Sequence, residues 1–171
     1  DPQTLPGDIH SILEKNFDLI SAHFESGAIA MMDLVDNEVR PRLDAHCLHG
    51  WHYTRLVDEE VAVMFKDGVS VSTRERLIER LKFAESRGLI SASDVSSLVD
   101  GSPLRDVGQE RARMGQFWMI SRPVRTDDSG IQPLIEHWGG EVVYFWQKDK
   151  ELLERLRAIG RSRIVELSVP T

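Results

Sequence analysis

Apolar residues recur at intervals of three and four along the first third of the chain, which is the spacing of one helix face. Two helices are predicted there. The first begins at the capping residue Asp8 and ends at Gly27. The second covers residues 29–43 and is interrupted at Arg40–Pro41, where we expect the helix to kink or restart, because proline cannot continue the helical hydrogen bonds. We expect this helical N-terminal part, residues 8–45, to pack on the rest of the protein.

The period changes at Cys47, where aromatic, β-branched and threonine residues become frequent. Such a composition is typical of strands. Strands are therefore predicted over four segments, Cys47–Val57, Gln116–Ser121, Glu141–Trp146 and Ile164–Val169.

Between these segments the helical period returns. A helix with an acidic start follows Val57 and stops at Gly68. The most regular helix begins at Ser72, whose spacing to Glu75 is that of a capping box, and it ends at Gly88. Shorter helices are predicted to start near Ser93–Asp94 and Ser102–Pro103 and to cover Ile131–Trp138 and Asp149–Ile159, and Pro123–Gly130 is predicted to be an exposed loop.

These elements predict an α+β fold, with the helical N-terminal part packed on a small, mostly antiparallel sheet. The chain has 171 residues, close to the size of one domain of ~100–150 residues, and no linker or internal repeat divides it. We therefore expect a single domain over residues 1–171, in which residues 46–171 form the mixed part.

The charge and the cysteine content indicate which binding partners and which cellular location to expect. The 28 acidic and 21 basic residues give a net charge of -7, which disfavours broad nucleic-acid binding but not a localised nucleic-acid substrate. The single cysteine, Cys47, cannot form an internal disulfide, and its position in a strand favours a buried, unreactive thiol. Residues 1–6 lack the features of a signal peptide, and no apolar stretch approaches the ~20 residues that cross a bilayer. A cytoplasmic protein with no membrane segment is expected.

Four side chains that can bind transition metals lie within seven positions, namely those of His46, Cys47, His49 and His52. In a strand, His46 and His52 point to one face while Cys47 and His49 point to the other. This alternation favours packing or surface roles over a metal site.

His52 and Thr54 lie two residues apart in the predicted strand, so both can meet one ligand, whereas Tyr53 points away. Arg55 follows, and its guanidinium can donate two parallel hydrogen bonds to a phosphate or a carboxylate. This arrangement is suited to an anionic nucleotide. The aromatic residues of the chain are more often core residues than ligand platforms.

The segment His52-Tyr53-Thr54-Arg55, followed by an acidic helix start and Gly68, resembles the opening of the ADP-ribosyltransferase superfamily. The likeness is to its histidine-type branches, which include the diphtheria-toxin group, the DNA-modifying toxins and the RNA 2′-phosphotransferases. There, the histidine and threonine of an H-x-T motif hold the nicotinamide ribose of NAD, which implicates His52 and Thr54. Residues 139–146 are similar to the family's central strand, whose tyrosine stacks on the nicotinamide, and this implicates Tyr144.

The resemblance implies NAD-dependent ADP-ribosyl transfer to a macromolecule or small molecule, in a toxin or defence factor that needs no metal. Transfer passes through a cation-like ribose, so a carboxylate is needed near the anomeric carbon. The family's glutamate lies on a later strand, and the candidates here are Glu141 and Glu166. By the resemblance Glu141 supplies the charge and Arg55 faces the pyrophosphate. We expect His52, Thr54 and Tyr144 on one wall of a cleft, with Glu141 or another acidic side chain opposite.

Two other classes of function stay open. The chain is also suited to be a non-catalytic acidic module, such as an immunity or regulatory protein that docks on a basic partner. The third alternative is a metal-dependent hydrolase built on the cluster from His46 to His52.

Overall fold

The computed structural model describes residues 7–16, 18, 33–43 and 47–170. They form an α+β fold with a two-stranded antiparallel sheet, which confirms the predicted fold class. The chain divides into two compact units. Unit 1 contains Asp1–Trp51, Ile120–Arg122 and Glu166–Thr171, and unit 2 contains His52–Met119 and Pro123–Val165.

Unit 1 contains helix α1 (Gly7–Lys15) and a helical segment formed by the π-helix η2 (Val35–Val39) and α4 (Arg40–Leu43). The helix changes at the predicted position: the widened π turn ends at Val39, α4 starts at Arg40, and the N–H of Arg40 donates to the carbonyl of Val35. A wider turn gives the proline ring room beside the preceding carbonyls. Residues 19–32, where the two predicted helices meet, lie outside the described residues.

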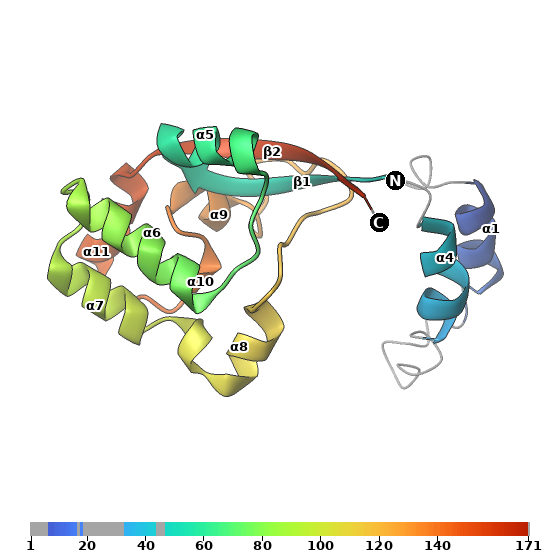
Figure 1. Ribbon diagram of the computed structural model, residues 1–171, viewed down its shortest axis with the longest axis horizontal. Coiled ribbons are helices and arrows are strands. Elements are labelled where there is room, and N and C mark those ends of the chain that lie inside the picture. Colours follow the sequence, from blue (N-terminus) through green and yellow to red (C-terminus); the bar gives the residue numbers. More distant parts are fainter. Residues whose placement is uncertain (1–6, 17, 19–32, 44–46, 171) are drawn as a thin grey trace. The chain divides into compact units, whose positions relative to one another are not determined.

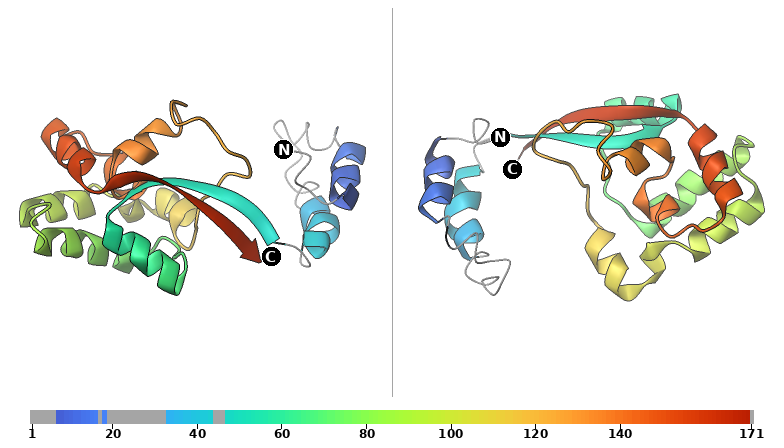
Figure 2. Two further views of the ribbon diagram at one scale, coloured as in Figure 1. Left: turned by 90° about the horizontal axis from the view of Figure 1, so that it is seen from above. Right: turned by 180° about the vertical axis from the view of Figure 1, so that it is seen from behind.

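The sheet is formed by β1 (Cys47–Leu56) and β2 (Arg161–Pro170), which run side by side in opposite directions (Figures 1 and 2). These two strands confirm the first and last of the four predicted. The segment Gln116–Ser121 is not a strand. Its only bridge joins Ile120 to Trp51, while at its other end the backbone of Ser72 bonds Gly115 and Gln116. Because the two ends of the segment bond to different parts of the chain, it does not form a continuous hydrogen-bonded ladder with either of them.

The predicted strand Glu141–Trp146 is also wrong, because Glu141–Tyr144 forms the short helix α10. Gly139 and Gly140 precede it with φ angles of 99° and 71°, which turn the chain sharply. The N–H of Val143 then bonds back to the carbonyl of Gly140 at 2.9 Å. A short apolar run has the same hydrophobic pattern in a strand and in a buried helix, so the pattern did not separate them.

Unit 2 contains most of the helices. Their bounds are α5 (Asp58–Asp67), α6 (Arg74–Ser86), α7 (Ala92–Asp100), the 3-10 helix η3 (Pro103–Arg105), α8 (Val107–Arg113), α9 (Gln132–Glu136), α10 and α11 (Lys150–Ala158). The predicted capping box at Ser72 is displaced by one residue, because the hydroxyl of Thr73 caps α6 by accepting from the N–H of Arg76. The predicted loop Pro123–Gly130 contains no helix or strand.

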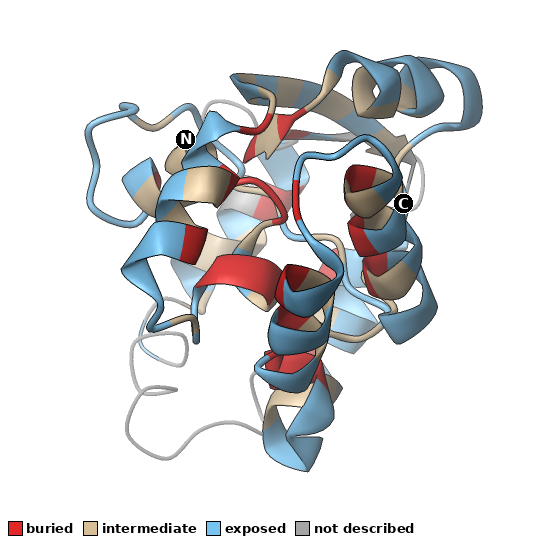
Figure 3. Ribbon diagram, turned by 90° about the vertical axis from the view of Figure 1, so that its left-hand side faces the viewer, coloured by how far each residue is buried: buried red, intermediate tan, exposed pale blue. Residues whose placement is uncertain are grey.

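The core of unit 2 lies between α6, α7, α10 and α11. It includes the fully buried Trp138 and leucines from three helices, Leu81, Leu98, Leu152 and Leu156. Figure 3 shows that these helices carry buried positions on one side and exposed positions on the other. No helix in the described ranges is both long enough and apolar enough to cross a membrane.

Candidate functional site

His52 and Thr54 lie on one face of β1, as their spacing predicts. Tyr53, on the opposite face, donates its hydroxyl hydrogen to the carbonyl of Val124 at 2.7 Å and accepts the N–H of the same residue at 2.8 Å. Tyr53 thus fixes the loop after Pro123 and is itself buried. The two faces of the strand therefore have different roles: Tyr53 on one face holds the loop, while His52 and Thr54 on the other face keep unused polar atoms.

The imidazole of His52 is held as one tautomer. Its Nδ1 lies 2.7 Å from the carbonyl oxygen of Trp118, and since a carbonyl only accepts, Nδ1 carries the proton. Burial lowers the pKa of His52 below its ordinary value, the bond to Trp118 opposes this, and the charge of Arg80 lowers the pKa further. The ring is therefore neutral at pH 7, and within the described chain its Nε2 has no hydrogen-bond partner.

Two aromatic residues accompany His52. The ring of Phe117 lies 4.5 Å from the imidazole, centroid to centroid, and the side chain of Trp118 is 67% exposed. Thr54 is buried, and its hydroxyl makes no side-chain hydrogen bond within the part of the protein that the structure describes. The face of β1 therefore combines a neutral acceptor and an unpaired hydroxyl, and the neighbouring segment carries an exposed indole. These groups suit a ligand with hydroxyl groups and a flat ring.

A partly buried polar cluster in the same unit joins α5, α6 and Trp138. The carboxylate of Glu60 accepts from the N–H of Val57 and from Nε1 of Trp138, both at 2.9 Å, and from Nε of Arg80. The guanidinium of Arg80 also lies over the Trp138 ring, 4.8 Å from its centroid. Because Glu60 uses both oxygens in these contacts, it positions Arg80 and Trp138 and is not a free catalytic carboxylate.

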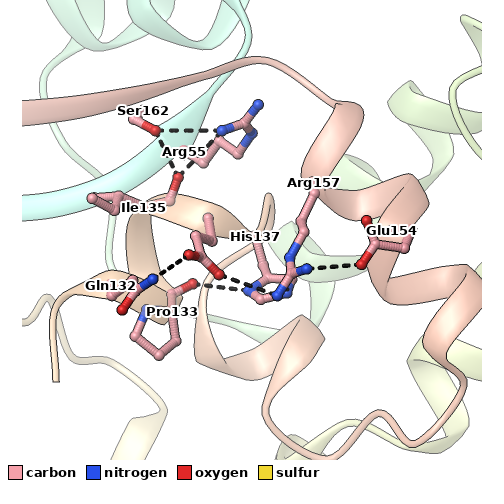
Figure 4. A network of polar contacts seen from close by, with 9 residues as sticks. Arg55, Gln132, Pro133, Ile135, His137, Glu154, Arg157 and Ser162 are labelled. Atoms are coloured by element: carbon pink, nitrogen blue, oxygen red, sulfur yellow. Dashed lines mark hydrogen bonds and ion pairs between the residues drawn. The ribbon is translucent and has the colours of Figure 1, made fainter. Parts of the chain in front are cut away.

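Arg55 points to the opposite face of β1 from His52 and Thr54, because adjacent strand residues alternate. Its guanidinium lines an open hollow of about 500 Å³ together with Arg157, Glu136 and Ser162. Figure 4 shows the guanidinium of Arg55 beside Ser162 and Ile135. Among the described residues that line this hollow, Arg55 is the only one of the predicted site residues. Arg55 therefore lines a different surface of the strand from His52 and Thr54.

We expected Tyr144 and Glu141 on a strand beside β1, but both lie on helix α10. Only 9% of Tyr144 is exposed, and its ring stacks on His137 with centroids 5.0 Å apart. Burial and the charge of Glu141 raise the pKa of the Tyr144 hydroxyl far above its usual range. Glu141 itself is about half-exposed, with a carboxylate oxygen 3.7 Å from Nη2 of Arg113.

Three members of the histidine and cysteine cluster, Cys47, His49 and His52, are described, and they do not converge on a metal site. His49 instead pairs with Glu166, with Nε2 3.1 Å from the carboxylate, and His46 lies outside the described residues. Over residues 7–16, 18, 33–43 and 47–170, no three His, Cys, Asp or Glu side chains gather in a metal-binding arrangement. Cys47 is a free thiol, but it is exposed, so the prediction that it is buried is wrong. It occupies the first position of β1, where no described residue covers it.

The sequence did not predict the roles of three polar residues of unit 2, Glu60, His137 and Arg157. His137 is buried, its Nδ1 donates to the carbonyl of Pro133 at 3.1 Å, and its Nε2 accepts from Nε of Arg157. Glu60, three residues after Val57, has the spacing of a capping residue, which is a usable signal. The partners of Glu60 and Arg157 on distant elements give no local signal.

Comparisons of the chain with protein-family models, with curated proteins and with solved structures found no match.

Proposed function

We propose that the chain binds NAD on the face of β1 that carries His52 and Thr54, and that it transfers the ADP-ribosyl group to an acceptor. One observation carries the proposal. His52 is a neutral histidine with a fixed tautomer whose Nε2 is free to accept, and it lies two residues from the unpaired hydroxyl of Thr54. A ribose presents vicinal hydroxyl groups that can donate to Nε2 and bond the threonine hydroxyl.

The exposed indole of Trp118 supports a nucleotide ligand. Stacking of a base on an aromatic side chain contributes about 1–3 kcal/mol. Trp118 is anchored beside the proposed ribose position through its carbonyl bond to His52. We assign it the stacking role that the family resemblance gives to Tyr144, because Tyr144 is buried against His137.

The transfer step breaks the bond between the ribose and nicotinamide, which leaves as a neutral base with the bonding electrons. The acceptor's nucleophile then forms a new bond to the anomeric carbon and releases its proton to solvent. As the bond breaks, positive charge develops on the ribose and needs a nearby carboxylate. Glu141 remains our candidate for this role. Its partner Arg113 lies at 3.7 Å, so the carboxylate is only loosely engaged.

Thermal unfolding with and without NAD tests the binding, because a ligand that binds only the folded state raises the midpoint. We expect NAD to raise the Tm of the parent protein and of a His49→Ala control. His49 lies on the same strand but on the other face and is half-exposed. We expect His52→Ala and Trp118→Ala to abolish the shift.

Two results would contradict the proposal. The first is a parent Tm that is unchanged at millimolar NAD. The second is an NAD shift that survives in His52→Ala. Either result would favour the acidic interaction module, for which the 89% exposed Phe65 on α5 is the most accessible apolar side chain among the described residues.

A further inference from the structure

The hollow beside Arg55 is the second site that the fold offers, and we infer that it binds the phosphate group of a small hydroxylated molecule such as a sugar phosphate. Its volume of about 500 Å³ falls within the range of small-molecule sites, ~300–1,000 Å³. The inference does not depend on NAD binding, since Arg55 points to the opposite face of β1 from His52.

Arg55 supplies an uncompensated positive charge. Its Nε donates to the carbonyl of Ile159 at 2.7 Å and its Nη2 to that of Gly160 at 3.1 Å. Its Nη1 lies 3.3 Å from both the carbonyl of Ile135 and the hydroxyl of Ser162. All four partners are neutral, and no acidic side chain pairs with Arg55 within the described residues.

These bonds also fix the direction of the guanidinium. A guanidinium has five N–H groups, so Arg55, with four in use, keeps one for a ligand. A charged group held rigidly by its own protein binds an anion without first losing side-chain freedom. The guanidinium of Arg55 is therefore preorganised to bind an anion.

Arg157 adds donors on the neighbouring part of the hollow. Its Nε donates to His137, its Nη1 to Glu154 and its Nη2 to Glu136, which leaves two of its five N–H groups (Figure 4). The charge of Arg157 is balanced by the two glutamates, so it contributes hydrogen bonds more than attraction. Arg55 and Arg157 both line the hollow, and together they keep three N–H groups without a partner among the described residues, which can donate to the oxygens of a terminal phosphate.

The rest of the lining favours a hydroxylated molecule over a bare anion. Thr126 and Gln132 add neutral polar groups, and the carboxylates of Asp127 and Glu136 can accept from hydroxyl groups. Asp127 is already paired with Arg125, with 2.7 Å between Nη2 and the carboxylate oxygen. A ligand with several hydroxyl groups beside its phosphate uses these positions, whereas a large apolar ligand does not.

Titration with inorganic phosphate and with glucose 6-phosphate, read as a shift in Tm at constant ionic strength, tests the inference. We expect both to raise the midpoint, glucose 6-phosphate by more, and glucose to leave it unchanged. Because Arg55→Lys risks unfolding the protein, two surface variants carry the test. Gln132 is exposed and Glu136 is partly exposed, so Gln132→Glu and Glu136→Gln change the charge of the hollow without opening the core.

The two variants are expected to act in opposite directions. Gln132→Glu adds a negative charge and should weaken phosphate binding about tenfold, while Glu136→Gln removes one and should strengthen it by a similar factor. A parent protein that does not respond to either phosphate compound overturns the inference, and so do two variants that bind phosphate like the parent. Because His52→Ala leaves the hollow intact, phosphate binding should persist in that variant, which separates this inference from the NAD proposal.

Discussion

Removal of the Glu60 carboxylate should be among the most damaging single changes in unit 2. The side chain is 16% exposed and accepts hydrogen bonds from Val57, Arg80 and Trp138. Glu60→Ala leaves the N–H of the fully buried Trp138 without its partner and Arg80 without its counter-charge. Each unsatisfied buried donor costs about 1–3 kcal/mol, and loss of one member of a buried ion pair costs about 3–5 kcal/mol, which is an upper limit for this partly buried pair. Since these terms overlap, we expect a total loss of about 4 kcal/mol in the free energy of unfolding.

Glu59 is a matched control for this experiment. It is the neighbouring glutamate in the first turn of α5, but its carboxylate is half-exposed and pairs with the exposed Arg87. Such pairs contribute little, because solvent screens them. Urea unfolding followed by tryptophan fluorescence should therefore separate Glu60→Ala clearly from Glu59→Ala. Equal midpoints for the two variants would refute the assignment of Glu60 as the centre of the cluster.

Further predictions concern the glycine turn and pH. A Cβ at Gly139 would lie 2.4 Å from the side chain of Val143, whereas a Cβ at Gly140 would meet nothing within 4 Å. Gly139→Ala should therefore lower the Tm much more than Gly140→Ala. Equal effects of the two substitutions would contradict the close packing of Gly139 against Val143. The pKa of His52 is lowered by burial from its ordinary 6.5, so the folded state disfavours the protonated ring. Stability from this source is present above pH 6.5 and is lost as the pH falls below it. The Tm should thus drop more between pH 7.5 and pH 5.5 in the parent than in His52→Gln, and parallel pH profiles would argue against the buried neutral ring.

The sequence predicted those elements whose signals are local. The change to a two-residue period at Cys47 located β1, and the same period placed His52 and Thr54 on one face. The same alternation places Arg55 on the other face of β1, so Arg55 cannot share one ligand surface with His52 and Thr54. The position of Arg55 was therefore predictable, while its four hydrogen bonds to residues more than 75 positions away were not.

The wrong strand at Glu141–Trp146 has a different cause. Val142, Val143 and Tyr144 suit a strand by composition, but Gly139 and Gly140 in left-handed conformations reverse the chain just before them. The turn then places Val143 against Gly139 and Tyr144 against His137 in the core. The segment is too short for its hydrophobic pattern to distinguish a helix from a strand, so tertiary packing determines its conformation.

The imidazole ¹⁵N spectrum of His52 tests the proposed NAD site most directly, with His52→Gln used to assign its resonances. The account predicts a proton on Nδ1 at pH 7.5 and a bare Nε2, whose resonance moves upfield when NAD is added, as expected for a nitrogen that begins to accept a hydrogen bond. A proton on Nε2 in the free protein, or an Nε2 resonance that does not move at saturating NAD, would contradict it.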